Sequence, residues 1–250
     1  MSCASAAPLR LFSPRHRGTS AWTVAASYGG GLVAGDGVAL EVEVGDGAAA
    51  LVGTQAETKV YRSRGAPCQM EVLARVGLGG ALALVPDPVS CFSGARYRQL
   101  QRVELDPGGT LLIVDALVAG RAARGERWAF EEYSSRIEVV RGGRLVVADA
   151  LRLTPREGPA LPARMGNFDL LATVAALGPR LAARAASLLV EVGRLPADGG
   201  ADVLLGASRL ADGLHLRLAA RSVEAGLARL RALLAFLPEF LGVDPFSHRP

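Results

Sequence analysis

Several features are scarce in this chain, and each scarcity excludes a class of protein. Cysteine occurs only at Cys3, Cys68 and Cys91, with no CxxC pair, so we expect a reducing compartment and no disulfide framework. The longest apolar run, residues 111–119, is interrupted by Asp115, so we expect no membrane-spanning segment. The first residues lack a charged segment followed by a long apolar stretch. The sequence therefore predicts a cytoplasmic protein.

Lysine is nearly absent as well. Lys59 is the only lysine among the 28 basic residues, and the others are arginine. The net charge is only +4, which is too small an excess to indicate a nucleic-acid partner. Half of the 250 residues are hydrophobic and 21% are charged, so the chain can bury a substantial core.

The motifs of several common enzyme classes are missing. Val60 follows the single lysine, so the chain has no conventional Walker A loop, and it contains no GxSxG segment. The three histidines, His16, His215 and His248, are far apart in sequence and have no second His or Cys at ligand spacing. These absences exclude the usual nucleotide, serine and zinc hydrolases.

Up to about residue 153, the sequence shows a pattern of short β-strands. Residues 38–44 place apolar side chains at every second position, as in a half-buried strand. Four strand–turn–strand units follow, and their turn glycines, Gly47, Gly79, Gly108 and Gly142, recur at intervals of about 30 residues. This recurrence predicts layered β-hairpins, as in a β-solenoid or a stacked sandwich. An ordinary β-sandwich meander fits the pattern equally well.

After residue 154 the pattern changes. Residues 168–192 are rich in Ala and Leu and predict helices. Residues 203–218 predict a hairpin with an Asp-Gly turn, and residues 222–241 predict an amphipathic helix with Ser222 as its N-cap.

Together these patterns predict a mainly β fold of stacked layers, with about two α-helices in the C-terminal third. We expect one domain over residues 1–250. It would consist of a stacked β-hairpin region, residues 1–153, and a region of helices plus a hairpin, residues 154–250.

Asp115 stands out among the scattered charges. It lies between apolar residues 111–114 and 116–118, where burial is expected, and a buried carboxylate needs a partner or a role. One alternative is a carbohydrate-acting β-solenoid enzyme that uses Asp87 and Asp115 as paired carboxylates. The low aromatic content of 5% disfavours it, since sugar sites usually display aromatic platforms. A purely structural β-protein is the other alternative.

Four segments match one known family in order and spacing. They are residues 30–36 (GGLVAGD), 53–63 (GTQAETKVYRS), 86–88 (PDP) and 119–130 (AGRAARGERWAF). Through them, residues 9–153 resemble the urease accessory proteins of the UreD family, called UreH in some organisms. The C-terminal third matches only in character, and residues 244–250 are a loose match to the Pro/Arg-rich tail of many members.

The resemblance implies stacked β-strands with two helices, and a function that is not enzymatic. Members of the family bind a helical accessory protein, UreF, and through it a GTPase, UreG, that carries nickel. The assembly docks on the urease apoprotein and promotes building of its dinuclear nickel site. The resemblance thus implies a urease maturation factor, a scaffold or metallochaperone, with transient Ni²⁺ passage and no permanently bound cofactor.

A nickel passage must bind the ion well enough for entry and weakly enough for exit. Scattered oxygen ligands meet this requirement better than a His/Cys cage, which would trap Ni²⁺. Four acidic residues are our candidates for lining or flanking such a passage: Asp36, Glu57, Asp115 and Glu126.

Seven further residues are candidates for partner contacts or structural roles: Thr54, Gln55, Thr58, Lys59, Tyr61, Asp87 and Arg121. The two threonines would add hydroxyl oxygens to the passage. Arg121 would order it by pairing with Glu126. Lys59 and Tyr61 fit a partner contact and an ordinary strand surface equally well.

Overall fold

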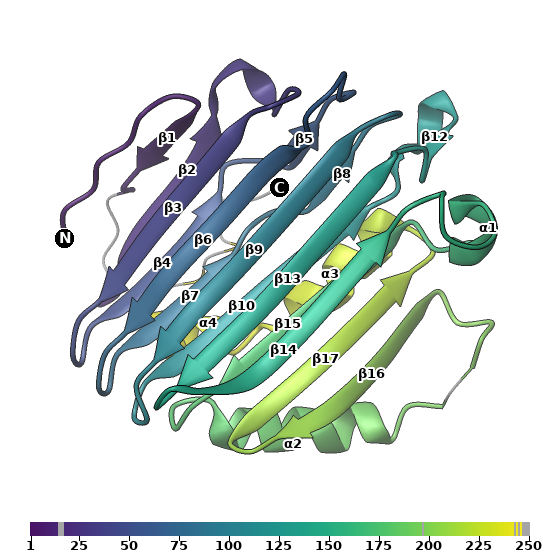
Figure 1. The fold of residues 1–250 in the computed structure, drawn as a ribbon. Coiled ribbons are helices and arrows are strands. Elements are labelled where there is room, and N and C mark those ends of the chain that lie inside the picture. The colour runs from purple at the N-terminus through teal and green to yellow at the C-terminus, as the bar shows by residue number, and fades with distance from the viewer. Residues whose placement is uncertain (15–17, 197, 243, 245, 247–250) are drawn as a thin grey trace.

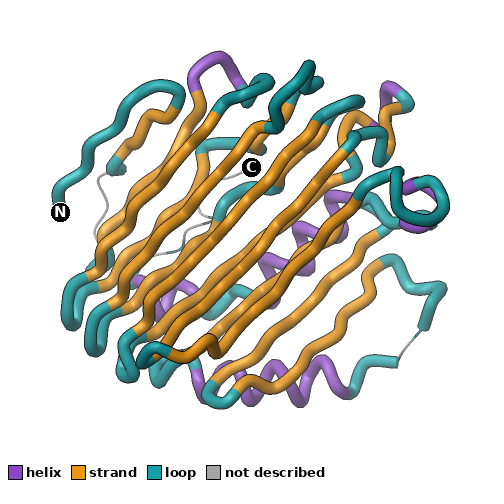
Figure 2. The backbone as a smooth tube through the Cα atoms, viewed as in Figure 1, coloured by secondary structure: helices purple, strands orange, loops and turns teal. Residues whose placement is uncertain are grey.

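The computed structural model describes residues 1–14, 18–196, 198–242, 244 and 246 (Figure 1). Two β-sheets face each other, and the main helices lie on the outer side of the larger sheet (Figure 2). The predicted mainly β class with stacked, solenoid-like layers is confirmed. Most of the C-terminal tail, and His16 and His248, lie outside the described residues.

The smaller sheet has five strands in the order β14-β13-β9-β6-β3. Its first four strands in sequence run parallel, and β14 pairs antiparallel with β13. The bounds are β3 (Gly37–Val44), β6 (Cys68–Val76), β9 (Arg96–Leu105), β13 (Glu132–Arg141) and β14 (Arg144–Leu153).

The larger sheet has the order β1-β2-β4-β7-β10-β15-β17-β16; in addition, β8 pairs with β10, and β5 pairs with β8. Strands β2, β4, β7 and β10 are parallel, and β15, β17 and β16 follow antiparallel. The bounds are β1 (Leu9–Phe12), β2 (Ala21–Ser27), β4 (Ala49–Thr54), β5 (Thr58–Val60), β7 (Ala81–Val85), β8 (Val89–Cys91), β10 (Thr110–Val118), β15 (Leu170–Leu177), β16 (Val203–Leu210) and β17 (Gly213–Ala220). A separate ribbon joins β11 (Gly120–Arg121) to β12 (Glu126–Arg127).

Three of the four predicted strand–turn–strand units are not hairpins. In β3–β4, β6–β7 and β9–β10 the turn carries the chain from the smaller sheet to the larger. Only in the fourth unit do the two strands, β13 and β14, pair with each other as a hairpin. Gly47 and Gly79 have φ of 65° and 66° in the first two turns, a conformation that favours glycine. Hairpins and solenoid coils share the same alternation and turn residues, so the sequence pattern did not separate them.

The C-terminal region contains four described α-helices: α1 (Leu161–Met165), α2 (Ala182–Gly193), α3 (Val223–Leu233) and α4 (Leu237–Leu241). The helical prediction for residues 168–192 is wrong in its first half, because residues 170–177 form β15. This strand lies between β10 and β17 and is covered on both faces, so it shows no alternation.

The predictions for residues 203–218 and 222–241 agree more closely with the structure. The predicted hairpin is confirmed as β16–β17. The predicted last helix begins as expected, since the Ser222 hydroxyl accepts a hydrogen bond from the Ala225 N–H at 3.1 Å. It is divided into α3 and α4, with Pro238 in the first turn of α4.

Buried apolar side chains form three clusters. One lies between the larger sheet and the helices, and includes Leu112, Val114 and Leu230. The other two lie between the sheets: the first, which includes Ile113, is nearer the turns that join the sheets, and the second includes Leu117. Within the described residues, no helix is long and apolar enough to cross a bilayer.

Candidate functional site

A layer of polar side chains separates the two apolar clusters between the sheets. Asp115 belongs to this layer: it lies on the inward face of β10, between Ile113 of one apolar cluster and Leu117 of the other. We call the inward-facing polar residues at this level the polar layer; they are Thr54, Asp115 and Thr173 of the larger sheet, and Gln99, Gln101, Ser135 and Asp149 of the smaller sheet.

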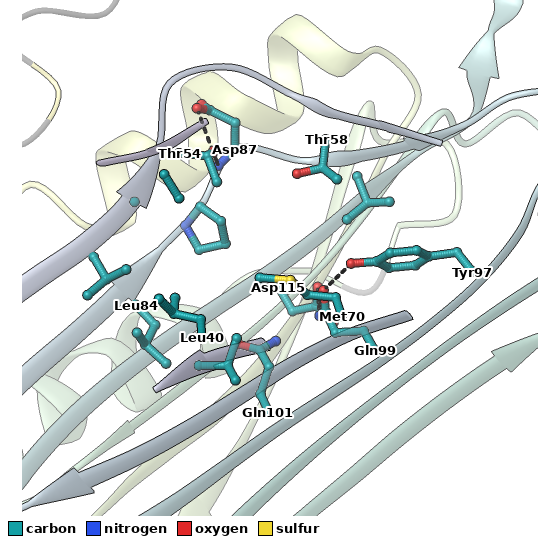
Figure 3. A pocket seen from close by; sticks show the side chains of 16 residues that line it. Leu40, Thr54, Thr58, Met70, Leu84, Asp87, Tyr97, Gln99, Gln101 and Asp115 are labelled. Carbon is teal, nitrogen blue, oxygen red and sulfur yellow. Dashed lines mark hydrogen bonds between the residues drawn. The ribbon is translucent and has the colours of Figure 1, made fainter. Parts of the chain in front are cut away.

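Hydrogen bonds hold the Asp115 carboxylate from both sides. Gln99 Nε2 donates to Oδ1 at 3.1 Å, and the Ser135 hydroxyl donates to Oδ2 at 2.5 Å. The Tyr97 hydroxyl in turn donates to Gln99 Oε1 at 2.9 Å, which orients the amide (Figure 3). The chain therefore builds a defined place for a carboxylate between its sheets.

Burial raises the pKa of Asp115, and the negative charge of Asp149 adds to that effect. The hydrogen bonds from Ser135 and Gln99 oppose it by stabilising the carboxylate. Among the described residues, no arginine, lysine or histidine forms an ion pair with Asp115. A half-buried carboxylate without a counter-ion is a favourable position for a mobile cation.

Two small cavities meet at Asp115. One, of about 70 Å³, lies between the sheets and is lined by Thr54, Thr58, Asp87 and Gln99 as well as Asp115 (Figure 3). The other, of about 20 Å³, is lined by Asp115, Tyr133, Ser135, Asp149 and Thr173. The smaller one has room for about one water molecule.

A larger cavity adjoins each of these small ones. On the β5 side, a cavity of about 220 Å³ shares Thr54 and Thr58 with the 70 Å³ cavity. On the β17 side, a cavity of about 400 Å³ shares Asp149 and Thr173 with the 20 Å³ cavity. Successive cavities with common lining residues thus follow the polar layer from one side of the fold to the other.

Thr54 and Asp87 are joined at one end of the 70 Å³ cavity. The Thr54 hydroxyl donates to Asp87 Oδ2 at 3.0 Å and accepts from the Asp87 backbone N–H at 2.7 Å. The pair links the last residue of β4 to the segment after the neighbouring strand β7. Two of the four segments that resemble the UreD family therefore meet at this cavity.

The structure brings together only some of the residues predicted from the sequence. Thr54, Thr58, Asp87 and Asp115 line the 70 Å³ cavity. The adjoining 220 Å³ cavity is lined by Gln55, Glu57 and Lys59. Desolvation raises the pKa of Glu57, while the charge of Lys59 lowers it.

Asp36, Glu126 and Arg121 line neither of these cavities. Asp36 Oδ2 accepts a hydrogen bond from the Val33 N–H at 2.8 Å in the loop before β3. Arg121 and Glu126 form the predicted pair, with contacts of 2.5 and 3.0 Å across the β11–β12 ribbon. The Arg121 hydrogen bond is the main cause of the lowered pKa of Glu126.

Tyr61 has a packing role at the same end of the fold. Its ring packs edge-on against Phe92, with centroids 5.3 Å apart, and the Arg121 guanidinium lies 4.3 Å from the Phe92 ring centre. The Arg121–Glu126 pair thus orders a surface ribbon and an aromatic contact.

Sequence reasoning missed the smaller-sheet half of the polar layer: Gln99, Gln101, Ser135 and Asp149. A signal was present in β9. Period-two alternation places Gln99 and Gln101 on the same face as Val103 and Leu105, which are buried. Polar residues at inward positions of a strand mark a polar interior.

The two carboxylates of the carbohydrate-enzyme alternative, Asp87 and Asp115, do line one cavity. That cavity has a volume of only about 70 Å³, whereas sites for small organic ligands are typically several hundred Å³. Thr54 bonds Asp87, and Gln99 and Ser135 bond Asp115. The geometry does not favour glycoside hydrolysis.

Comparison with known proteins identifies the family. A model of the UreD urease accessory protein family matches residues 1–249. This chain belongs to the UreD family. The chain is 59% identical over 250 residues to urease accessory protein UreD of Anaeromyxobacter sp. (strain Fw109-5), which covers 100% of the chain and 84% of the relative. Membership in this family indicates an accessory role in urease maturation.

More distant relatives carry the same description. The chain is 51% identical over 243 residues to UreD of Sorangium cellulosum (strain So ce56), covering 97% of the chain and 77% of the relative. It is 34% identical over 273 residues to urease accessory protein D of Oryza sativa subsp. indica, covering 98% and 89%. The similarity therefore includes the C-terminal third, where motif matching alone found no specific signal.

Proposed function

We propose that this UreD-family protein is a non-enzymatic, cytoplasmic maturation factor that helps deliver nickel to apo-urease, in a complex with UreF-type and UreG-type accessory proteins. The observation that carries the proposal is the polar layer, with an enclosed carboxylate at Asp115, in the interior of a urease accessory protein. A protein whose only task is to hold partners together has no need of such an interior.

The ligand chemistry of the polar layer suits a transient ion. Carboxylate, amide and hydroxyl oxygens bind a divalent transition metal less tightly than thiolates or imidazoles do. The cavities on either side of Asp115 have volumes of only about 70 and 20 Å³, so protein oxygens would replace part of the hydration shell of the ion. A single half-buried carboxylate then attracts the cation without enclosing it.

The residues that line the successive cavities define the order of positions along the proposed passage. Glu57 lines the larger cavity on the β5 side, the Thr54–Asp87 pair follows, and Asp115 stands between the two small cavities. Asp149 borders the larger cavity on the β17 side. Asp36 and Glu126 line none of these cavities, and we assign them no place in the passage.

The proposal is tested by replacing Asp115 with Asn in urease-producing cells that lack the native copy of this gene. Asn keeps the size of the side chain but cannot carry the charge that attracts the ion. We expect urease activity to fall by at least roughly ten-fold, the effect of about 1.4 kcal/mol at one step. Asp106→Asn, in an exposed turn, is the matched control and should retain full activity.

Pull-downs of both variants with the UreF-type partner and with apo-urease accompany the activity measurement. Intact complexes combined with low activity would support a role of Asp115 in transfer. Full urease activation by Asp115→Asn would contradict the proposal.

A further inference from the structure

The polar layer ends at three charged or polar side chains on β14 and β17. Asp149 of β14 faces inward, and its side chain is only 11% exposed. Arg217 of β17 forms an ion pair with Asp149 Oδ1, and His215 Nε2 lies 3.6 Å from Asp149 Oδ2. Arg217 is also in register with Thr173 and Asp115 across three neighbouring strands. The trio thus continues the row that contains the central carboxylate.

His215 is an unusual member of this trio. Strand alternation directs Leu214 and Leu216 into the helix-side cluster, which leaves His215 on the face toward Asp149. Its Nε2 atom is buried and forms no hydrogen bond with any part of the chain that the structure describes. A buried ring nitrogen beside a carboxylate is an available ligand position for a transition metal.

Arg217 differs from its two neighbours in exposure. Its side chain is 61% exposed, against 18% for His215 and 11% for Asp149. Exposed ion pairs are worth little, because water and salt screen them, so the guanidinium can leave Asp149 at low cost. The adjoining cavity of about 400 Å³, lined by Asp149 and Arg217, gives space for that movement and for water.

We propose that Asp149 and His215 form a weak binding site for a divalent transition-metal cation at the β17 end of the polar layer, with Arg217 as its displaceable occupant. The guanidinium neutralises Asp149 while no metal is bound, and an arriving cation takes its place. One imidazole nitrogen and one carboxylate, completed by water, hold nickel more firmly than the oxygen ligands at Asp115. Two protein ligands are too few to trap the ion.

This inference rests on the proposed function, because the cation in question is the nickel that the polar layer would carry. The site would retain an ion at the edge of the fold until the next acceptor removes it. The alternative is a purely structural cluster in which Arg217 and His215 stabilise Asp149 and no metal is bound. The two alternatives differ in the effect of removing the arginine charge: the metal site predicts tighter Ni²⁺ binding, and the structural cluster predicts unchanged Ni²⁺ binding.

The test uses the purified full-length chain with His16→Asn and His248→Asn, which leaves His215 as the only histidine. Ni²⁺ is titrated by calorimetry, and the His215 ring protons are followed by NMR. Arg217→Gln, which removes the charge but keeps a donor, should tighten Ni²⁺ binding at least roughly ten-fold. Arg217→Lys keeps the charge and should bind as weakly as the parent.

His215→Ala, added to Arg217→Gln, should abolish the gain. Ni²⁺ should broaden the His215 ring signals when Asp149 is present and should leave them sharp in Asp149→Asn. Equal Ni²⁺ affinity of the parent and Arg217→Gln, or a gain that survives His215→Ala, would overturn the site. These measurements require no urease. Loss of the site would therefore leave the activation result for Asp115 intact, and failure of the Asp115 test would leave the binding result intact.

Discussion

The two faces of β10 pack into very different surroundings. On the face toward the helices, Leu112, Val114, Ala116 and Val118 all join one apolar cluster. On the opposite face, Asp115 interrupts the apolar series and joins a hydrogen-bonded polar layer. One strand therefore supports a dry core on one side and a polar interior on the other.

This comparison separates stability from function in the same sheet. The helix-side layer has the chemistry of a stabilising core, because it removes apolar surface from water without enclosing charge. The layer between the sheets retains a carboxylate that burial disfavours, although a neutral side chain of similar size would fit there. We infer that the first layer is kept for folding and the second for passage.

The largest expected effect lies on the helix side. Leu112 is fully buried there, and Leu112→Ala should lower the free energy of unfolding by about 2–5 kcal/mol. Val146→Ala on the outer face of β14, where the side chain is 36% exposed, is the control and should change it by less than about 0.5 kcal/mol. Urea unfolding measures both, and similar losses in the two variants would contradict the assignment of the stabilising core.

An intermediate effect is expected from the charge of Asp115. The pKa of Asp115 in the folded protein is raised above the ordinary value of 3.8, which applies to the unfolded chain. At a pH between the ordinary pKa and the raised pKa, Asp115 is deprotonated in the unfolded chain and still protonated in the folded protein. Stability therefore falls as the pH rises through this window, by about 1.4 kcal/mol for each pH unit. Asp115→Asn removes this dependence, so its advantage over the wild type should grow with pH and then level off.

Unfolding curves of the wild type and Asp115→Asn from pH 4 upward provide the measurement. Ser135→Ala sharpens it, because loss of a hydrogen bond that lowers the pKa of Asp115 should extend the window to higher pH. A constant difference between the wild type and Asp115→Asn at every pH would contradict a buried, titrating carboxylate.

The smallest effect concerns the helices that cover the apolar face. Ser222 caps α3 through its hydrogen bond from the Ala225 N–H, and Ser222→Ala should cost about 1 kcal/mol. Ser222→Asp, which retains the cap, should recover most of that loss in the same unfolding assay. Failure of Asp to recover the stability would mean that the cap is not what Ser222 contributes.

Much of the fold followed from the sequence, because alternation and turn residues are local signals. The strands of the four repeat units, the β16–β17 hairpin and the start of α3 were predicted. The pairing of the strands was not predicted, because the units at Gly47, Gly79 and Gly108 cross from one sheet to the other and do not form hairpins. Strand β15 was mistaken for a helix, because burial on both faces removes the alternation that distinguishes a strand.

The candidate site could be predicted only in part. Asp115 was found because an acid within an apolar run is visible locally, and Thr54, Thr58 and Asp87 were found through their matching segments. Asp36 and Glu126 belonged to matching segments as well, but the fold places them outside the cavities that contain Asp115. His215 and Asp149 are 66 positions apart, and only the packing of β14 against β17 brings them to 3.6 Å.

Nickel analysis of urease tests the central claim most directly. Urease purified from cells that carry Asp115→Asn should contain little nickel, while urease from cells with Asp106→Asn should be fully loaded. Both accessory proteins should be recovered at equal levels and in the same complexes. Fully nickel-loaded urease from the Asp115→Asn cells would contradict a passage through the polar layer.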